Sequence, residues 1–108
     1  MKSQLVRRLI KEDFDRCFEE SGIDVLLTPT APTEAKRLKE MYDEADPVTE
    51  YMNDLMTIPA NLAGLPAISL PIGVGANQLP VGIQLMAQHR SDENLLLVAH
   101  ALESYLLP

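Results

Sequence analysis

The side chain best placed to bind a charged ligand is the carboxylate of Asp54, which follows Asn53 in an apolar helical stretch. Two interpretations stay open from the residues alone. Asp54 could face water, or it could cap the chain around Thr57. Alternatively, it could point into a partly dry cleft and form a charge-assisted hydrogen bond to a cation, such as the α-ammonium group of an amino acid.

The other reactive side chains do not form a catalytic set. A hydrolase needs a nucleophile, a base that activates it, and donors for the oxyanion. We expect His89 in a polar loop and His100 in the last helix, where structural or exposed roles are more typical than catalysis. Cys17 lies on the apolar face of the first predicted helix, which favours a buried, inert thiol. No Cys/His spacing indicates a zinc site.

Two further segments resemble ligand loops only superficially. The run Gly73-Val74-Gly75 is too short for a phosphate loop, and a plain turn explains it better. The acid-rich segment from Glu40 to Asp46 lacks the central glycine and the final bidentate acid of a calcium loop. We therefore expect residues 34–46 to be a solvated excursion.

The composition limits the class of protein. The 108 residues suffice for one small domain, and 46% hydrophobic with 23% charged residues indicates a globular chain. The net charge of -7 argues against direct binding of nucleic-acid backbones. The single cysteine excludes an internal disulfide and fits a reducing compartment. No apolar run approaches the roughly 20 residues that span a bilayer, so we expect no membrane contact.

The periodicity of apolar residues predicts an α/β fold in one domain. We expect helices over residues 3–20, from Asp46-Pro47 to a break at Pro59, and after an N-cap at Ser91. Continuous apolar runs predict strands at 25–27 and 67–70, each buried on both faces. A further strand at 81–86 would form a hairpin with 67–70 around a turn at 75–78. Pro29 and Pro32 favour an extended loop over residues 28–33.

Several blocks of the sequence resemble the amidase signature family. The strongest are residues 57–73, TIPANLAGLPAISLPIG, and residues 79–86, LPVGIQLM. The helix KSQLVRRLIKEDFD at 2–15, the stretch DVLLTPTAPT at 24–33, and Asn53-Asp54 are similar to the A subunits of glutamyl-tRNA(Gln) amidotransferases within that family. The resemblance covers almost the whole chain.

The resemblance implies a fold and a role. The family has an α/β/α core around a large mixed sheet, of which residues 1–108 would be a C-terminal segment, incomplete as a domain. A Ser–cis-Ser–Lys triad hydrolyses glutamine, and the ammonia passes to the B subunit. That partner uses ATP and Mg to convert Glu-tRNA(Gln) to Gln-tRNA(Gln), and a small C subunit holds the complex together. This chain would itself need no cofactor and would reach tRNA only through the partner.

The resemblance also assigns a role to Asp54, which matches a glutamine-binding aspartate of the family. The Gly/Ser-rich segment with both catalytic serines and the segment with the lysine are missing from the chain. We therefore expect an inactive fragment, a truncated gene model or the product of a split gene. A fragment of another carboxamide-hydrolysing amidase and a non-catalytic interaction module stay open. The stretch from Leu27 to Thr30 with Glu34-Ala35 resembles mitochondrial members, which favours the mitochondrial matrix over the bacterial cytoplasm.

The first testable prediction concerns stability. Three helices of this size cannot cover both faces of a sheet, so apolar surface should stay exposed and the isolated chain should be at best marginally stable. The measurement is thermal unfolding of the pure monomer together with binding of a hydrophobic dye. A cooperative transition without dye binding would contradict the prediction.

Overall fold

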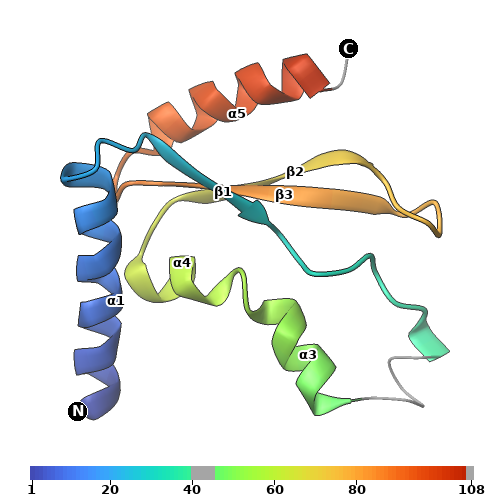
Figure 1. Ribbon diagram of the computed structural model, residues 1–108, viewed down its shortest axis with the longest axis horizontal. Coiled ribbons are helices and arrows are strands. Elements are labelled where there is room, and N and C mark those ends of the chain that lie inside the picture. The colour runs from blue at the N-terminus through green and yellow to red at the C-terminus, as the bar shows by residue number, and fades with distance from the viewer. Residues whose placement is uncertain (40–45, 107–108) are drawn as a thin grey trace.

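The computed structural model describes residues 1–39 and 46–106. Residues 40–45 of the segment considered as a calcium loop lie outside the described part. Figure 1 shows the arrangement of the elements. In chain order they are α1 (Lys2–Glu19), β1 (Val25–Pro29), α3 (Pro47–Asp54), α4 (Ile58–Ala63), β2 (Ala67–Val74), β3 (Pro80–Ala87) and α5 (Asp92–Leu106).

The three described strands form one antiparallel sheet in the order β1-β3-β2. The predicted hairpin is confirmed, because β2 pairs with β3 from Ala67 opposite Met86 to Val74 opposite Pro80. β1 pairs along the other edge of β3, with Leu27 opposite Leu85. β3 is therefore the central strand, and all strand pairing in the described sheet passes through it.

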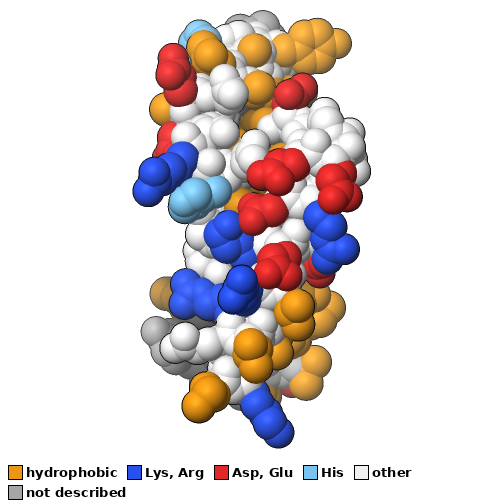
Figure 2. All heavy atoms as spheres, turned by 90° about the vertical axis from the view of Figure 1, so that its left-hand side faces the viewer, with side chains coloured by type: hydrophobic (Ala, Val, Ile, Leu, Met, Phe, Trp, Pro, Cys, Tyr) orange, Lys and Arg blue, Asp and Glu red, His pale blue; other side chains and the backbone are white. Residues whose placement is uncertain are grey.

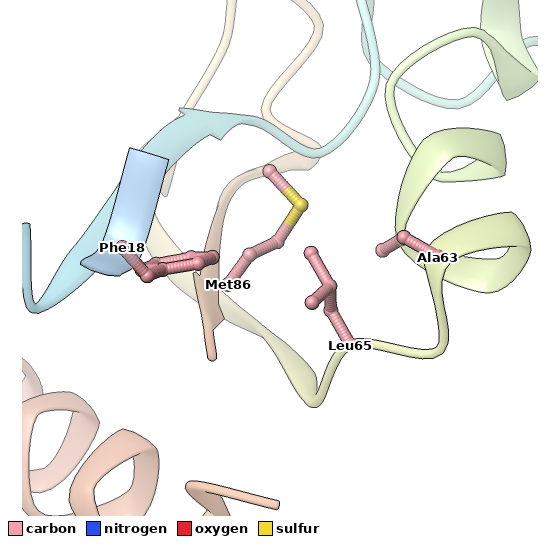
Figure 3. Packing of buried hydrophobic residues seen from close by; sticks show 5 residues of the cluster. Phe18, Ala63, Leu65 and Met86 are labelled. Atoms are coloured by element: carbon pink, nitrogen blue, oxygen red, sulfur yellow. The ribbon is translucent and has the colours of Figure 1, made fainter. Parts of the chain in front are cut away.

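Helices lie on both faces of this sheet, with α5 on one side and α1 and α4 on the other (Figure 1). Consecutive residues of a strand point to opposite faces. Leu85 and Ala87 accordingly pack with Leu95 and Ala99 of α5. Met86 points the other way, between Phe18 of α1 and Leu65 beside α4 (Figure 3). The layers confirm the predicted α/β class.

The edge strands differ from the prediction in length and burial. β1 continues through Thr28 and Pro29, where we expected a loop, and Pro29 stands opposite Ile83. An edge strand tolerates this proline because the missing N–H belongs on the open side. The expectation that 25–27 and 67–70 are buried on both faces is wrong for this chain, since Leu27 is 58% exposed and Ala67 and Ser69 are exposed as well. β2 also runs beyond Pro71, and its register shifts between Pro71 and Gly73.

The start of α3 follows its sequence signal, but the predicted end at Pro59 is wrong, because α3 ends at Asp54 and Pro59 lies in the first turn of α4. Asp46 caps α3 by accepting hydrogen bonds from the Val48 amide (3.1 Å) and the Thr49 hydroxyl (3.0 Å). Gly64 ends α4 in the left-handed conformation, with φ of 69°. The predicted apolar face of α3 exists in sequence, but no residue of α3 is buried, and Tyr51 is 61% exposed.

The first helix is only half covered. Ile10, Phe14 and Phe18 contact the core through the C-terminal half of α1, whereas Leu5 and Leu9 near the N-terminus are exposed. Figure 2 shows charged side chains across the middle of this side of the molecule and hydrophobic ones at the end near the N-terminus. The sequence predicted one apolar face correctly, but this structure buries only part of it.

The chain is flat, with extents of 45 × 44 × 18 Å. Its radius of gyration is 16.0 Å, whereas a compact domain of this length has about 13 Å. Its accessible surface is 8076 Å², against about 6,000 Å² for a compact chain of this mass. Much of the excess is apolar, on α1, α3 and α5. None of the described helices is long and apolar enough to cross a membrane.

The cross-strand pair Leu27 and Leu85 gives the second prediction. Leu85 is 1% exposed, so Leu85→Ala should lower the free energy of unfolding by about 2–5 kcal/mol through lost burial and a cavity. Leu27→Ala is the matched control on the neighbouring strand and should cost less than about 0.5 kcal/mol. Because the isolated chain is expected to be marginally stable, urea unfolding is followed in a buffer with enough sulfate to strengthen apolar burial and give the wild-type chain a measurable transition. Equal effects would show that β3 is not the core strand.

Candidate functional site

A cavity of about 430 Å³ lies where the segment after β1, the end of α3 and the β2–β3 hairpin meet. The segment after β1 provides residues 30–31 and 33–36, α3 provides Asn53, and the hairpin provides Ser69 and residues 80–82. The lining combines hydroxyl groups, one carboxamide, one carboxylate and one ammonium group. Such a lining suits a small polar ligand that carries charges of both signs.

The floor of the cavity lies at Gly82, the position of β3 that has no side chain. The hydroxyls of Thr30 and Ser69 lie 2.8 Å apart and share a hydrogen bond. They meet over Gly82, where a Cβ atom would lie 3.0 Å from Ser69 Oγ and 3.3 Å from Thr30 Oγ1. Within the described chain, each of these hydroxyls hydrogen-bonds the other and no basic side chain, so neither has the partner that would activate a nucleophile. The pair therefore suits ligand binding rather than nucleophilic attack.

Gln84 lies next to this floor, on the same face of β3 as Gly82 and Met86. It is the buried polar residue of the described chain, with 4% of its surface exposed. Its Nε2 group donates to Thr28 Oγ1 at 3.1 Å and to the carbonyl oxygen of Met56 at 2.9 Å. Along one face of β3, Met86 thus makes an apolar contact, Gln84 is a buried amide, and Gly82 borders the cavity.

Glu34 closes one side of the cavity. Its carboxylate oxygens accept from the backbone N–H of Asn77 at 3.3 and 3.2 Å. The carboxylate occupies the space where a side chain at Gly75 would lie. The turn itself is held by the Gly75 amide, which donates to the Leu79 carbonyl at 2.9 Å, and confirms the predicted turn at 75–78. The segment after β1 is thus fastened across the hairpin.

Asp54 lies at the last position of α3 and is exposed. Its neighbour Asn53 lines the cavity, and Asp54 is not among the described lining residues. No described hydrogen bond joins the Asp54 carboxylate to the chain around Thr57, and the Thr57 hydroxyl and amide instead both donate to the Asp54 backbone carbonyl, each at 3.1 Å. Asp54 thus lies at the margin of the cavity only as the residue that follows Asn53 in the chain, and the role of its carboxylate as a ligand-binding group stays a prediction.

The histidines and the cysteine lie away from the cavity. His89 follows β3 in an exposed turn, and its Nδ1 donates to the Gly64 carbonyl at 3.0 Å. His100 is exposed on α5, and Cys17 is a partly buried free thiol of α1. In the described ranges, no group of three or more His, Cys, Asp or Glu side chains could hold a metal ion.

Sequence reasoning missed the residues that build the cavity floor. Thr30, Ser69, Gly82 and Gln84 were not singled out, because each is common in loops and strands. One signal was available. The alternation in residues 81–86 places Gly82, Gln84 and Met86 on one face of a strand whose other face is apolar. A glutamine on a strand in a sheet covered on both faces would be buried and would need partners.

The described chain is thus an α/β protein with helices on both faces of its sheet and a polar cavity at one end of the central strand. The family model described as Amidase matches residues 1–96, and the chain belongs to this family. Within it, the A subunit of glutamyl-tRNA(Gln) amidotransferase from Microcystis aeruginosa is 52% identical over 103 residues, which are 95% of this chain and 20% of that protein. The protein of the same name from Synechococcus sp. is 55% identical over 102 residues, with 94% and 20% covered.

Solved structures support the same family assignment. The crystal structure of the A subunit of glutamyl-tRNA(Gln) amidotransferase from Thermotoga maritima superposes with a TM-score of 0.84 and 43% identity, covering 94% of this chain and 21% of that one. The substrate complex of 6-aminohexanoate cyclic dimer hydrolase gives a TM-score of 0.76 and 32% identity, covering 94% and 23%. The chain thus spans about a fifth of the length of the relatives it matches.

The close approach at Gly82 gives the third prediction. Gly82→Ala should separate the Thr30 and Ser69 hydroxyls and cost about 1–3 kcal/mol of stability, because the new methyl group also lies 3.4 Å from the Leu70 carbonyl. Gly73→Ala is the matched control in β2, where a Cβ atom meets nothing within 4 Å. Urea unfolding of the two variants measures the difference. A Gly82→Ala variant as stable as Gly73→Ala would contradict the packing described.

Proposed function

We propose that this chain is part of the glutaminase subunit of a glutamyl-tRNA(Gln) amidotransferase. The observation that carries the proposal is the 52–55% identity to A subunits of that enzyme over nearly all of the chain. The whole enzyme would hydrolyse glutamine and use the ammonia for ATP-dependent conversion of Glu-tRNA(Gln) to Gln-tRNA(Gln). The chain would contribute one wall of the glutamine site.

The catalytic groups would come from outside these residues. The cavity lining contains a threonine and a serine hydroxyl that hydrogen-bond each other, and in the described structure neither is bonded to Lys36, so the Ser–cis-Ser–Lys triad of the family is not formed by these groups. The chain by itself would therefore be inactive. The exposed apolar face of α1, with Leu5, Val6 and Leu9, supports this proposal, because it is a surface on which the missing part of the fold could pack.

Asp54 would bind the α-ammonium group of glutamine. The proposal is supported by the neighbouring position of Asn53, which lines the cavity, and it requires that a second wall of the site is supplied from outside these residues. Burial by that wall would lower the local dielectric and strengthen the charge-assisted bond. We assign to Asp54 the glutamine-binding role that the matching aspartate has in the family.

The proposed partners are the B and C subunits of the amidotransferase. ATP and Mg would act in the B subunit, and tRNA would bind there rather than on this acidic chain. The compartment would be one in which this route supplies Gln-tRNA(Gln), either the mitochondrial matrix or the bacterial cytoplasm.

A second candidate function is a part of a simple carboxamide hydrolase. It is favoured by the likeness to 6-aminohexanoate cyclic dimer hydrolase, at 32% identity and a TM-score of 0.76. The two candidates differ in the ligand, because an α-amino acid has an ammonium group for Asp54 and a cyclic amide does not. A complementation assay that includes both glutamine and a cyclic amide therefore distinguishes them.

The fourth prediction is glutaminase activity by complementation. The chain would be mixed with the separately expressed preceding part of the Thermotoga maritima protein, and glutamine hydrolysis would be followed by ammonia release. We expect activity only in the mixture. Asp54→Ala and Asp54→Asn should raise the KM for glutamine about 10- to 100-fold, because each loses a charge-assisted hydrogen bond.

Asp24→Ala is the matched control, since Asp24 is an exposed aspartate before β1 and away from the cavity. An associated mixture that hydrolyses a cyclic amide but not glutamine would support the second candidate. An associated mixture without any amidase activity would overturn both and leave the chain as an interaction module.

A further inference from the structure

Gln84 connects three segments that are far apart in the sequence. From the centre of β3, its amide nitrogen donates to Thr28 of β1 and to Met56 between α3 and α4. These partners are 56 and 28 residues away in the chain. With 4% of its surface exposed, Gln84 has little water to compensate for a lost partner.

The two partners each lead directly into a wall of the cavity. Thr28 precedes Thr30, whose hydroxyl meets Ser69 at the floor. Met56 follows Asn53, which lines the cavity, and Asp54, which lies at its margin. Since α3 has no buried residue of its own, the bond to the Met56 carbonyl is a principal attachment of the end of α3 to the sheet.

We propose that Gln84 is a positioning residue that sets the distance between the two walls of the substrate cavity. This inference rests on the proposed function for the identity of the substrate, an α-amino acid amide, and on the structure alone for the geometry. Gln84 does not touch the substrate. It acts through the Met56 carbonyl and the Thr28 hydroxyl, which hold the end of α3 and the segment after β1 at fixed positions.

The kinetic test uses Gln84→Met in the complemented mixture. Methionine has a similar shape but no N–H, so both acceptors lose their donor while the volume is kept. Because the catalytic groups come from the other polypeptide, misplaced binding walls should raise the KM for glutamine about tenfold or more and leave kcat within about threefold. A merely structural role would instead reduce the number of active complexes, which lowers the apparent kcat and leaves KM unchanged.

Gln88→Met is the matched control, because Gln88 follows β3 and its amide donates to the exposed Glu19 at 3.2 Å, away from the cavity. It should leave both KM and kcat unchanged. A Gln84→Met variant with an unchanged KM would overturn the inference while leaving the proposed function intact. A wild-type mixture without glutaminase activity would overturn the proposed function instead.

Hydrogen exchange decides the geometry independently of activity. The reporter amides are Leu55 and Thr57 at the end of α3, which donate to Met52 and Asp54, and Thr30, which donates to Gly82. Gln84→Met should raise their exchange rates at least tenfold. It should leave unchanged the exchange rate of the Leu95 amide of α5, which donates to the Ser91 carbonyl. Exchange that is unchanged at all reporters, or raised equally in α5, would overturn the inference.

Discussion

The pairing of β3 along both of its edges is the interaction on which the rest of the structure depends. β1 and β2 contact each other only through this strand in the described sheet, and each helical layer packs against one of its two faces. The alternation of β3 therefore sets the two cores and the cavity together. Leu85 and Ala87 pack against α5. On the opposite face of β3, Met86 lies in the apolar core, Gln84 is a buried amide and Gly82 lies at the cavity floor.

Much of the fold could be predicted from local signals. Asp46-Pro47 and the turn at 75–78 act through short-range hydrogen bonds and backbone conformations, and the structure confirms both of them. The extent of β1 could not be predicted, because a proline is tolerated or excluded according to whether its strand lies at an edge. That position depends on pairing with residues about 55 positions away.

The candidate site was less predictable for the same reason. Asp54 stood out as a carboxylate in an apolar helix, and its place beside Asn53 at the margin of the cavity is compatible with a binding role. The floor required the hydroxyls of Thr30 and Ser69, which are 39 residues apart, to meet over a glycine. Only the register of the sheet brings such residues together. Local pattern therefore left the role of Asp54 open, the family resemblance predicted a binding role for it, and neither predicted the shape of the cavity.

We propose that this chain carries a wall of an amino-acid site and not the reacting groups. The most direct measurement is a glutamine titration of the isotope-labelled chain in the associated mixture, followed by amide chemical shifts. We predict ligand-dependent shifts that cluster at Thr30, Ser69 and residues 53–54, with α5 unaffected. Glutamine hydrolysis by the mixture without shifts in these residues would contradict the claim.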